Sequence, residues 1–64
     1  MFTNKLREFR EAKGLSQLEL SYMTRISPSA ISLLESGRQF PHKGWQQRIA
    51  EALGVEEEVL FPEQ

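Results

Sequence analysis

SQLELSYMTRISPSAISLLESG, residues 16–37, contains the signals for two short helices and for the turn between them. Ser16 and Glu19 fit a capping box, in which the serine hydroxyl accepts from the Glu19 amide and the Glu19 carboxylate accepts from the Ser16 amide. Ser27-Pro28 is a second helix start, since serine caps well and proline at the first helical position loses no hydrogen bond that it needs. The helix that begins after Ser16 is expected to end near Thr24. The stretch therefore predicts two short helices that turn sharply against each other.

The second of these helices has two unlike faces. Its inward face is apolar and carries Ala30, Ile31 and Leu34, whereas its outward face carries Ser29, Ser32, Leu33 and Ser36. Two short helices joined by a tight turn form a helix-turn-helix arrangement, in which the second helix reads DNA. The outward face has hydroxyl groups and one leucine, but no arginine, asparagine or glutamine for bidentate base contacts. Any sequence preference should therefore be modest, or depend on DNA shape.

Three further helices are expected outside this stretch. One runs from about Asn4 to Lys13, one from His42 or Lys43 to Leu53, and one over residues 56–61. Their apolar positions follow the helical period, as in Trp45, Ile49, Ala52 and Leu53. We therefore expect an all-α fold of five short helices, in a single domain spanning residues 1–64.

Length and composition exclude several kinds of protein. The chain has 64 residues, one histidine and no cysteine. It lacks aspartate as well, so it offers no catalytic triad, no metal-ligand cluster and no cofactor motif. No apolar run approaches the roughly 20 residues of a membrane span. We expect a non-enzymatic protein without cofactor or metal that works in the cytoplasm.

Charge is distributed unevenly along the chain. Residues 1–43 hold seven basic and four acidic side chains, whereas residues 44–64 hold one basic and five acidic ones. One part of the folded protein could therefore meet phosphate while the other faces away.

Three separated motifs resemble the phage repressor and Cro-like family of transcriptional regulators (the xenobiotic-response-element type), whose fold is lambda-repressor-like. They are LREFREAKGLSQ at residues 6–17, ISPSAISLLESGR at residues 26–38, and Pro41 followed by IAEALGV at residues 49–55. The resemblance covers roughly residues 4–61. It implies five helices, the second and third of which form the DNA-reading motif.

The resemblance also implies roles for individual residues. Gln17, at the start of the second helix, would contact a phosphate, and Arg38 would reach the DNA backbone. Arg10 and Glu35 would form a partly buried ion pair that ties the first helix to the third. The full set of DNA-binding candidates is Gln17, Ser27, Pro28, Ser29, Ser32, Leu33, Arg38 and Lys43.

The chain departs from the family pattern at a few positions. Members usually have glycine in the turn where this chain has Arg25, which would be strained if the position needs a positive φ. Ser21 replaces a usual alanine, and Phe40 and Lys43 also differ from the common residues.

Two functions from different classes fit these features. The leading hypothesis is a sequence-preferring regulator that binds double-stranded DNA as a homodimer. Val59, Leu60 and Phe61 are candidates for the dimer interface, although they could equally complete the core of the monomer. The alternative is a protein-interaction module of the same fold, such as an antitoxin or a regulator's partner, with weak or no DNA binding.

Overall fold

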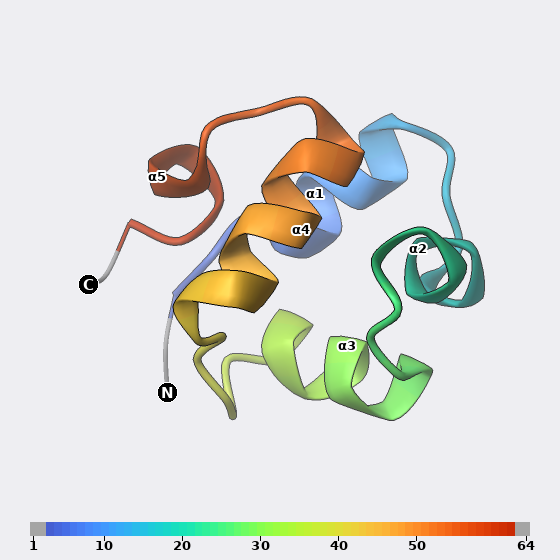
Figure 1. Ribbon diagram of the computed structural model, residues 1–64, viewed down its shortest axis with the longest axis horizontal. Helices are drawn as coiled ribbons and strands as arrows, with labels where there is room; N and C mark the ends of the chain where they lie inside the picture. The colour runs from blue at the N-terminus through green and yellow to red at the C-terminus, as the bar shows by residue number, and fades with distance from the viewer. Residues whose placement is uncertain (1–2, 63–64) are drawn as a thin grey trace.

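The computed structural model describes residues 3–62 and places five α-helices there. They are α1 (Leu6–Ala12), α2 (Gln17–Thr24), α3 (Pro28–Glu35), α4 (Lys43–Leu53) and α5 (Glu57–Leu60). As Figure 1 shows, α2 and α3 meet at a sharp turn, α4 crosses the middle of the molecule, and α5 lies at its edge. The expected all-α class, the number of helices and their order are confirmed. Only the ends differ, since α1 and α5 are each slightly shorter than expected.

Side chains that cap the helices fix where they begin. Ser16 and Glu19 form the expected capping box, with distances of 3.0 Å from the Glu19 amide to the serine Oγ and 2.8 Å from the Ser16 amide to the carboxylate. At the start of α3 the Ser27 hydroxyl accepts from the Ala30 amide at 3.1 Å. At α1 the N-cap residue is Lys5, whose side chain makes no cap bond, and the preceding Asn4 accepts from the Leu6 amide at 3.0 Å instead. Each cap satisfies an amide that the helix itself leaves unpaired.

One apolar core holds the helices together. Its buried members come from every helix and from the connections: Leu6, Leu20, Ile26, Ile31, Leu34, Ile49, Ala50, Leu53, Leu60 and Phe61. Phe40 packs edge-on against Phe61, with ring centroids 6.1 Å apart. Such an arrangement is favourable for two aromatic rings. The connection between α3 and α4 is thereby attached to the end of α5.

The expectation that Leu60 and Phe61 could form a dimer interface is wrong for this structure. Both are 0% exposed. A chain of this size has little apolar surface to spare, so the monomer uses these side chains to close its own core. Of the three candidates, Val59 alone remains exposed, at 41%.

The buried face of α4 differs from the expected stripe. Ile49 and Leu53 are buried as predicted, but Trp45 and Ala52 are only partly covered. Gln46 is buried instead, at 4% exposed, because its side-chain amide donates to the Pro41 carbonyl at 2.9 Å. Its Nε2 thus satisfies a backbone carbonyl, whereas its Oε1 is buried without a hydrogen-bond partner within residues 3–62, which costs free energy of desolvation.

Arg25 occupies a left-handed backbone conformation at the end of α2. Its φ is 60°, and it is the single non-glycine residue with positive φ in residues 3–62. The position where the family usually has glycine therefore does need the conformation that glycine adopts most easily. Within the same residues, none of the helices is both long and apolar enough to cross a membrane.

Candidate nucleic-acid interface

The outer face of α3 is open to solvent. Ser29, Ser32 and Leu33 are exposed, as the sequence predicted, and Leu33 is 41% exposed. In Figure 1, α3 runs along the lower edge of the molecule, whereas the acidic α5 lies at the upper left. The face that would read DNA is therefore not covered by α5.

The amino end of α3 adds backbone donors to this face. Ser27 and Pro28 are exposed there, and the Ser27 hydroxyl is occupied by its capping bond to Ala30. Proline has no N–H, so the Ser29 amide is the next donor, and it has no partner within residues 3–62. An unpaired amide at a helix start carries partial positive charge and suits an anion.

The amino end of α2 is arranged in the same way. The Glu19 amide is capped by Ser16, whereas the Gln17 and Leu18 amides have no partner in the part of the chain described. Two N–H groups thus point outward where the resemblance places a phosphate contact.

The side chain of Gln17 is held in place by a contact that the sequence did not reveal. Its Nε2 donates to Glu35 Oε1 at 3.0 Å, and the residue is half-buried. The two residues lie far apart in the sequence, on α2 and at the end of α3. Only the packing of these helices brings them together.

The ion pair between Arg10 and Glu35 forms as the resemblance implied. Arg10 Nε lies 2.5 Å from Glu35 Oε2, and the side chains are 10% and 6% exposed. The hydrogen bond to Glu35 raises the pKa of Arg10 above its ordinary value. The guanidinium also donates to the Leu15 carbonyl at 2.6 Å. The pair therefore joins α1, the end of α3 and the chain that leads into α2.

The two cations predicted to meet the DNA backbone have different surroundings. Arg38 is exposed just after α3, and no acidic side chain within residues 3–62 pairs with it. Lys43 Nζ instead lies 2.6 Å from Glu57 Oε1, and this bond raises the pKa of the lysine. The lysine side chain is 70% exposed, so water and salt weaken the pair. Lys43 would have to leave Glu57, or share it, to bind a phosphate.

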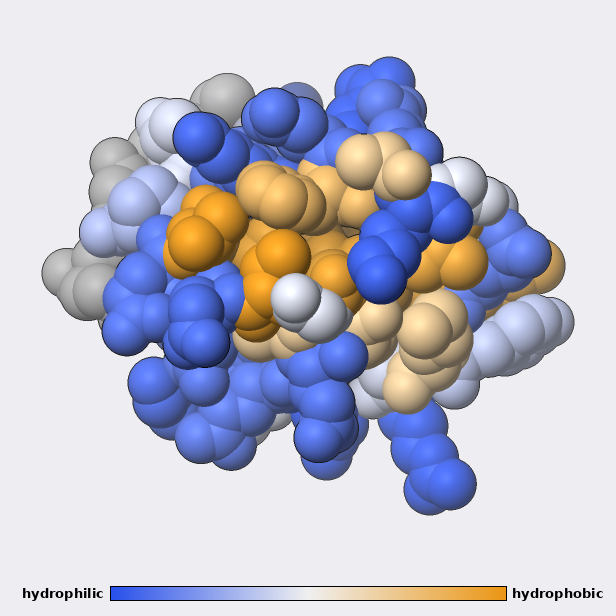
Figure 2. All heavy atoms as spheres, turned by 90° about the horizontal axis from the view of Figure 1, so that it is seen from above, coloured by the Kyte–Doolittle hydropathy of each residue, from blue (hydrophilic) through white to orange (hydrophobic). Residues whose placement is uncertain are grey.

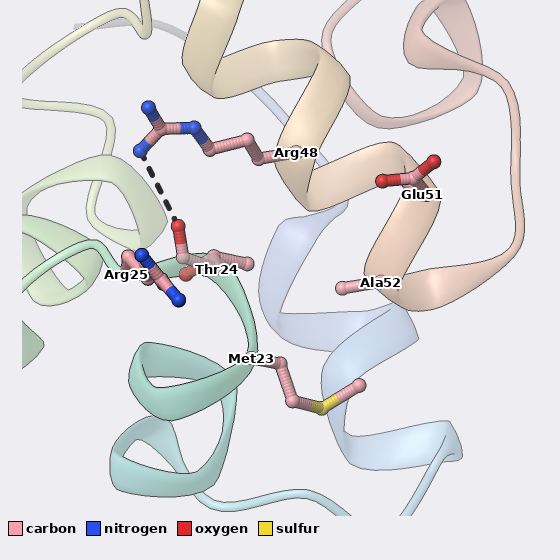
Figure 3. A pocket seen from close by; sticks show the side chains of 6 residues that line it. All are labelled: Met23, Thr24, Arg25, Arg48, Glu51 and Ala52. Carbon is pink, nitrogen blue, oxygen red and sulfur yellow. Dashed lines mark hydrogen bonds between the residues drawn. The ribbon is translucent and has the colours of Figure 1, made fainter.

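A shallow pocket of about 380 Å³ lies between the end of α2 and α4 (Figure 3). It is lined by Met23, Thr24, Arg25, Arg48, Glu51 and Ala52. Arg48 donates to the Thr24 carbonyl at 3.4 Å across its mouth, as the dashed line in Figure 3 marks. No outward residue of α3 lines this pocket, so it is separate from the candidate interface. Within residues 3–62, no group of three or more acidic, histidine or cysteine side chains could hold a metal ion.

Comparison with known proteins agrees with this arrangement. A model of the helix-turn-helix domain matches residues 2–61, so the chain belongs to the helix-turn-helix domain family. It is a DNA-binding transcriptional regulator.

Among solved structures, the chain is similar to the restriction-modification controller protein C.AhdI from Aeromonas hydrophila. The two share 35% sequence identity and superpose with a TM-score of 0.83, over 89% of this chain and 86% of that one. No curated protein matches this chain. The predicted resemblance and the predicted fold are thereby confirmed, whereas the roles of individual residues stay predictions.

Proposed function

We propose that this protein binds double-stranded DNA with a preference for certain sequences, with α3 in the major groove, and acts without catalysis as one domain over residues 1–64. The observation that carries the proposal is the uncovered outer face of α3, next to unpaired backbone amides at the starts of α2 and α3. A helix fits the major groove, and helix starts suit phosphate. A regulator of this kind works where the DNA is, which we take to be the cytoplasm.

The candidate residues divide into two groups by chemistry. Gln17, Arg38 and Lys43 are donors that would contact phosphate, and such contacts position the protein without reading sequence. The other candidates lie at the start or on the outer face of α3 and would contact the DNA in the groove: Ser27, Pro28, Ser29, Ser32 and Leu33. A hydroxyl group accepts several bases, and leucine packs on thymine methyl groups. Specificity should then come partly from the ease with which the DNA deforms.

A homodimer would give this small module enough contact with DNA. The half-sites of such dimers lie about 34 Å apart, whereas the longest Cα dimension of one copy is 25 Å. One copy therefore covers one half-site.

The α5 side of the molecule is the better place for the partner. In Figure 1, α5 lies at the left edge and α3 along the lower edge. A two-fold partner packed against the left edge would carry its own α3 along the same lower side, where one duplex could meet both. Figure 2 shows the upper face of Figure 1, where apolar atoms gather in the middle within a ring of polar ones; this face is not the left edge, so the interface is inferred from the exposed residues of the α5 side. Val59 on α5 is exposed and Val55 before it is partly buried, so we assign them to the interface in place of Leu60 and Phe61.

Two features of the chain favour a second function, docking onto a protein partner. The outer face of α3 lacks arginine, asparagine and glutamine, and the segment that contains α5 is acidic. Such a protein would have the same fold but would bind duplex DNA weakly or not at all.

A salt titration separates the two functions. Binding to a duplex is measured by fluorescence anisotropy over a range of salt concentrations. Neutralisation of Z phosphates predicts a slope near −0.9Z on a log–log plot, and two copies with a few contacts each predict a steep slope. No measurable affinity for any duplex at low salt would remove DNA binding from the proposal and leave partner docking.

A selection from random duplexes tests the dimer and the sequence preference together. Selection at low salt should enrich an inverted repeat with half-sites about one helical turn apart. Enrichment of a single half-site would contradict the dimer, and no enrichment would contradict the sequence preference.

A further inference from the structure

The Glu35 carboxylate accepts hydrogen bonds from two other helices at once. It accepts from Arg10 of α1 through Nε at 2.5 Å and through Nη2 at 3.3 Å. It also accepts from Gln17 Nε2 at 3.0 Å. The side chain of Glu35 is 6% exposed, so this carboxylate has little freedom to turn toward other partners. Burial and these contacts fix the orientation of the Glu35 side chain, and the Gln17 amide is held by it.

The bond to Glu35 leaves Gln17 able to contact something else. A side-chain amide nitrogen carries two hydrogens that point in different directions. One is directed to Glu35, and the other remains on a residue that is only half-buried. The backbone amides of Gln17 and Leu18 are unpaired within residues 3–62. The side chain and backbone thus present their remaining donors at one place, the start of α2.

Arg10 fixes the chain on the other side of the same place. Its Nη1 donates to the Leu15 carbonyl at 2.6 Å, directly before the Ser16 cap. The entry into α2 is therefore attached to α1, while the first residue of α2 is attached to the end of α3. A rigid connection of this kind sets the distance between the start of α2 and the outer face of α3.

We propose that Glu35 is a positioning residue for DNA binding: its side-chain oxygen holds the Gln17 amide so that the second N–H meets a phosphate while α3 lies in the groove. This inference rests on the proposed function. A side chain that is already ordered loses less entropy on binding, and this is the physical origin of the gain in affinity. Glu35 itself does not touch the DNA.

Two simpler roles make different predictions. If the pair only stabilises the fold, its loss lowers the free energy of unfolding and leaves the affinity of the folded protein unchanged. If Glu35 only repels phosphate, any neutral substitution strengthens binding, whether or not Gln17 is present. A test must therefore keep the charge constant and vary only the acceptor for Gln17.

Two double variants meet this requirement. Arg10→Met with Glu35→Gln keeps an amide oxygen that can accept from Gln17, whereas Arg10→Met with Glu35→Met cannot accept. Both replace the ion pair by neutral, unbranched side chains of similar size, a change that cores often tolerate. Both are also made with Gln17→Ala. Urea unfolding verifies that each variant is folded before its affinity for one duplex is measured.

The proposal predicts a difference that depends on Gln17. The Glu35→Gln double variant should bind about fivefold more tightly than the Glu35→Met one, as expected from one hydrogen bond. The difference should disappear when Gln17 is alanine. Equal affinities with Gln17 present, or a difference that survives Gln17→Ala, would overturn the proposal. If the unmodified protein binds no duplex, it is the proposed function that fails.

A measurement on the unmodified protein covers the case in which a double variant does not fold. The ¹⁵N relaxation of side-chain amides reports their mobility on the ps–ns timescale. The Gln17 amide should be as rigid as the backbone, whereas that of Gln47, which is exposed on α4, should be mobile. A Gln17 amide as mobile as that of Gln47 would contradict its positioning by Glu35.

Discussion

Arg25 has a left-handed backbone conformation because α2 and α3 must turn sharply within very few residues. Its φ is 60°, and all other residues with a positive φ in residues 3–62 are glycines. A Cβ in this conformation lies too close to the neighbouring carbonyl, which costs roughly 1–2 kcal/mol. The residue keeps an exposed cation beside the start of α3, at the expense of strain in the turn.

Arg25→Gly should raise the free energy of unfolding by about 0.5–1 kcal/mol, since relief of strain exceeds the extra backbone entropy that glycine loses on folding. Urea unfolding monitored by circular dichroism measures the change. Arg25→Ala is the control, because it removes the same charge and keeps the Cβ. An equal gain in both variants would show that the charge, and not the backbone, causes the destabilisation.

Gln17→Ala is expected to weaken binding to all duplexes by a similar factor, because a phosphate contact carries no sequence information. Because Gln17 also donates to Glu35, the free energy of unfolding should fall by about 1 kcal/mol while the protein stays folded. Competition binding with several duplexes, together with urea unfolding, measures both effects. A change in the ranking of duplexes would mean that Gln17 reads bases.

At the scale of elements, α3 combines two separable properties, its stability and its surface. Its start depends on Ser27, whose hydroxyl caps the Ala30 amide at 3.1 Å. Its inner face is fixed by Ile31 and Leu34, each 0% exposed. The outer face contributes little to the core and is free to serve recognition. Substitutions on the two faces should therefore have different consequences.

Ser27→Ala should lower the free energy of unfolding by about 1 kcal/mol, because the cap is lost. Thermal unfolding should show this as a fall in Tm of about 4–8 °C for a chain of this size. Ser32→Ala is the matched control on the exposed face, where alanine is the better helix former and no loss is expected. Similar losses in both variants would rule out capping as the cause.

Ser29→Ala and Leu33→Ala should change the order in which duplexes are preferred, and they should alter stability by no more than about 0.5 kcal/mol, as usual for exposed positions. The measurement is a random-duplex selection repeated with each variant. An unchanged ranking for both would show that α3 is not the reading helix.

At the scale of the whole molecule, the core and the proposed dimer interface compete for the same few apolar residues. Residues 44–64 carry five acidic side chains and one basic one, yet they also supply Leu60 and Phe61 to the core. The segment therefore packs Leu60 and Phe61 inward, while Glu56 and Glu58 beside them stay exposed. This arrangement leaves Val59 as the exposed apolar residue of α5.

Val59→Asp should dissociate the dimer and leave the monomer folded, because the side chain is 41% exposed. Sedimentation equilibrium should show a smaller fraction of dimer, and the affinity for the duplex should fall. Leu60→Ala, one position further on, should instead lower the free energy of unfolding by about 2–5 kcal/mol, because it leaves a cavity in the core. A monomeric protein before any substitution, or a Val59→Asp variant that still dimerises, would contradict the interface proposed here.

The helices and their turns could be predicted from local features of the chain. Capping residues, prolines and the apolar period act over a few neighbouring positions, so Ser16, Ser27 and the stripe of α3 could be interpreted without coordinates. The Arg10–Glu35 ion pair was predicted from the family resemblance, because no local pattern links two residues so far apart in the chain. Whether Arg25 has a positive φ does not follow from the sequence, because it depends on how α2 and α3 pack.

The packing of the helices determines which of several residues of similar hydropathy are buried. It also determines which residues far apart in the chain are in contact. Leu60 and Val59 are alike in hydropathy, and only the packing of α5 determines that one closes the core while the other faces solvent. Gln46 is buried where its Nε2 donates to the Pro41 carbonyl, and Gln17 meets Glu35 because packing brings the start of α2 next to the end of α3. Contacts between residues far apart in the chain depend on how the helices pack, and no local pattern encodes them.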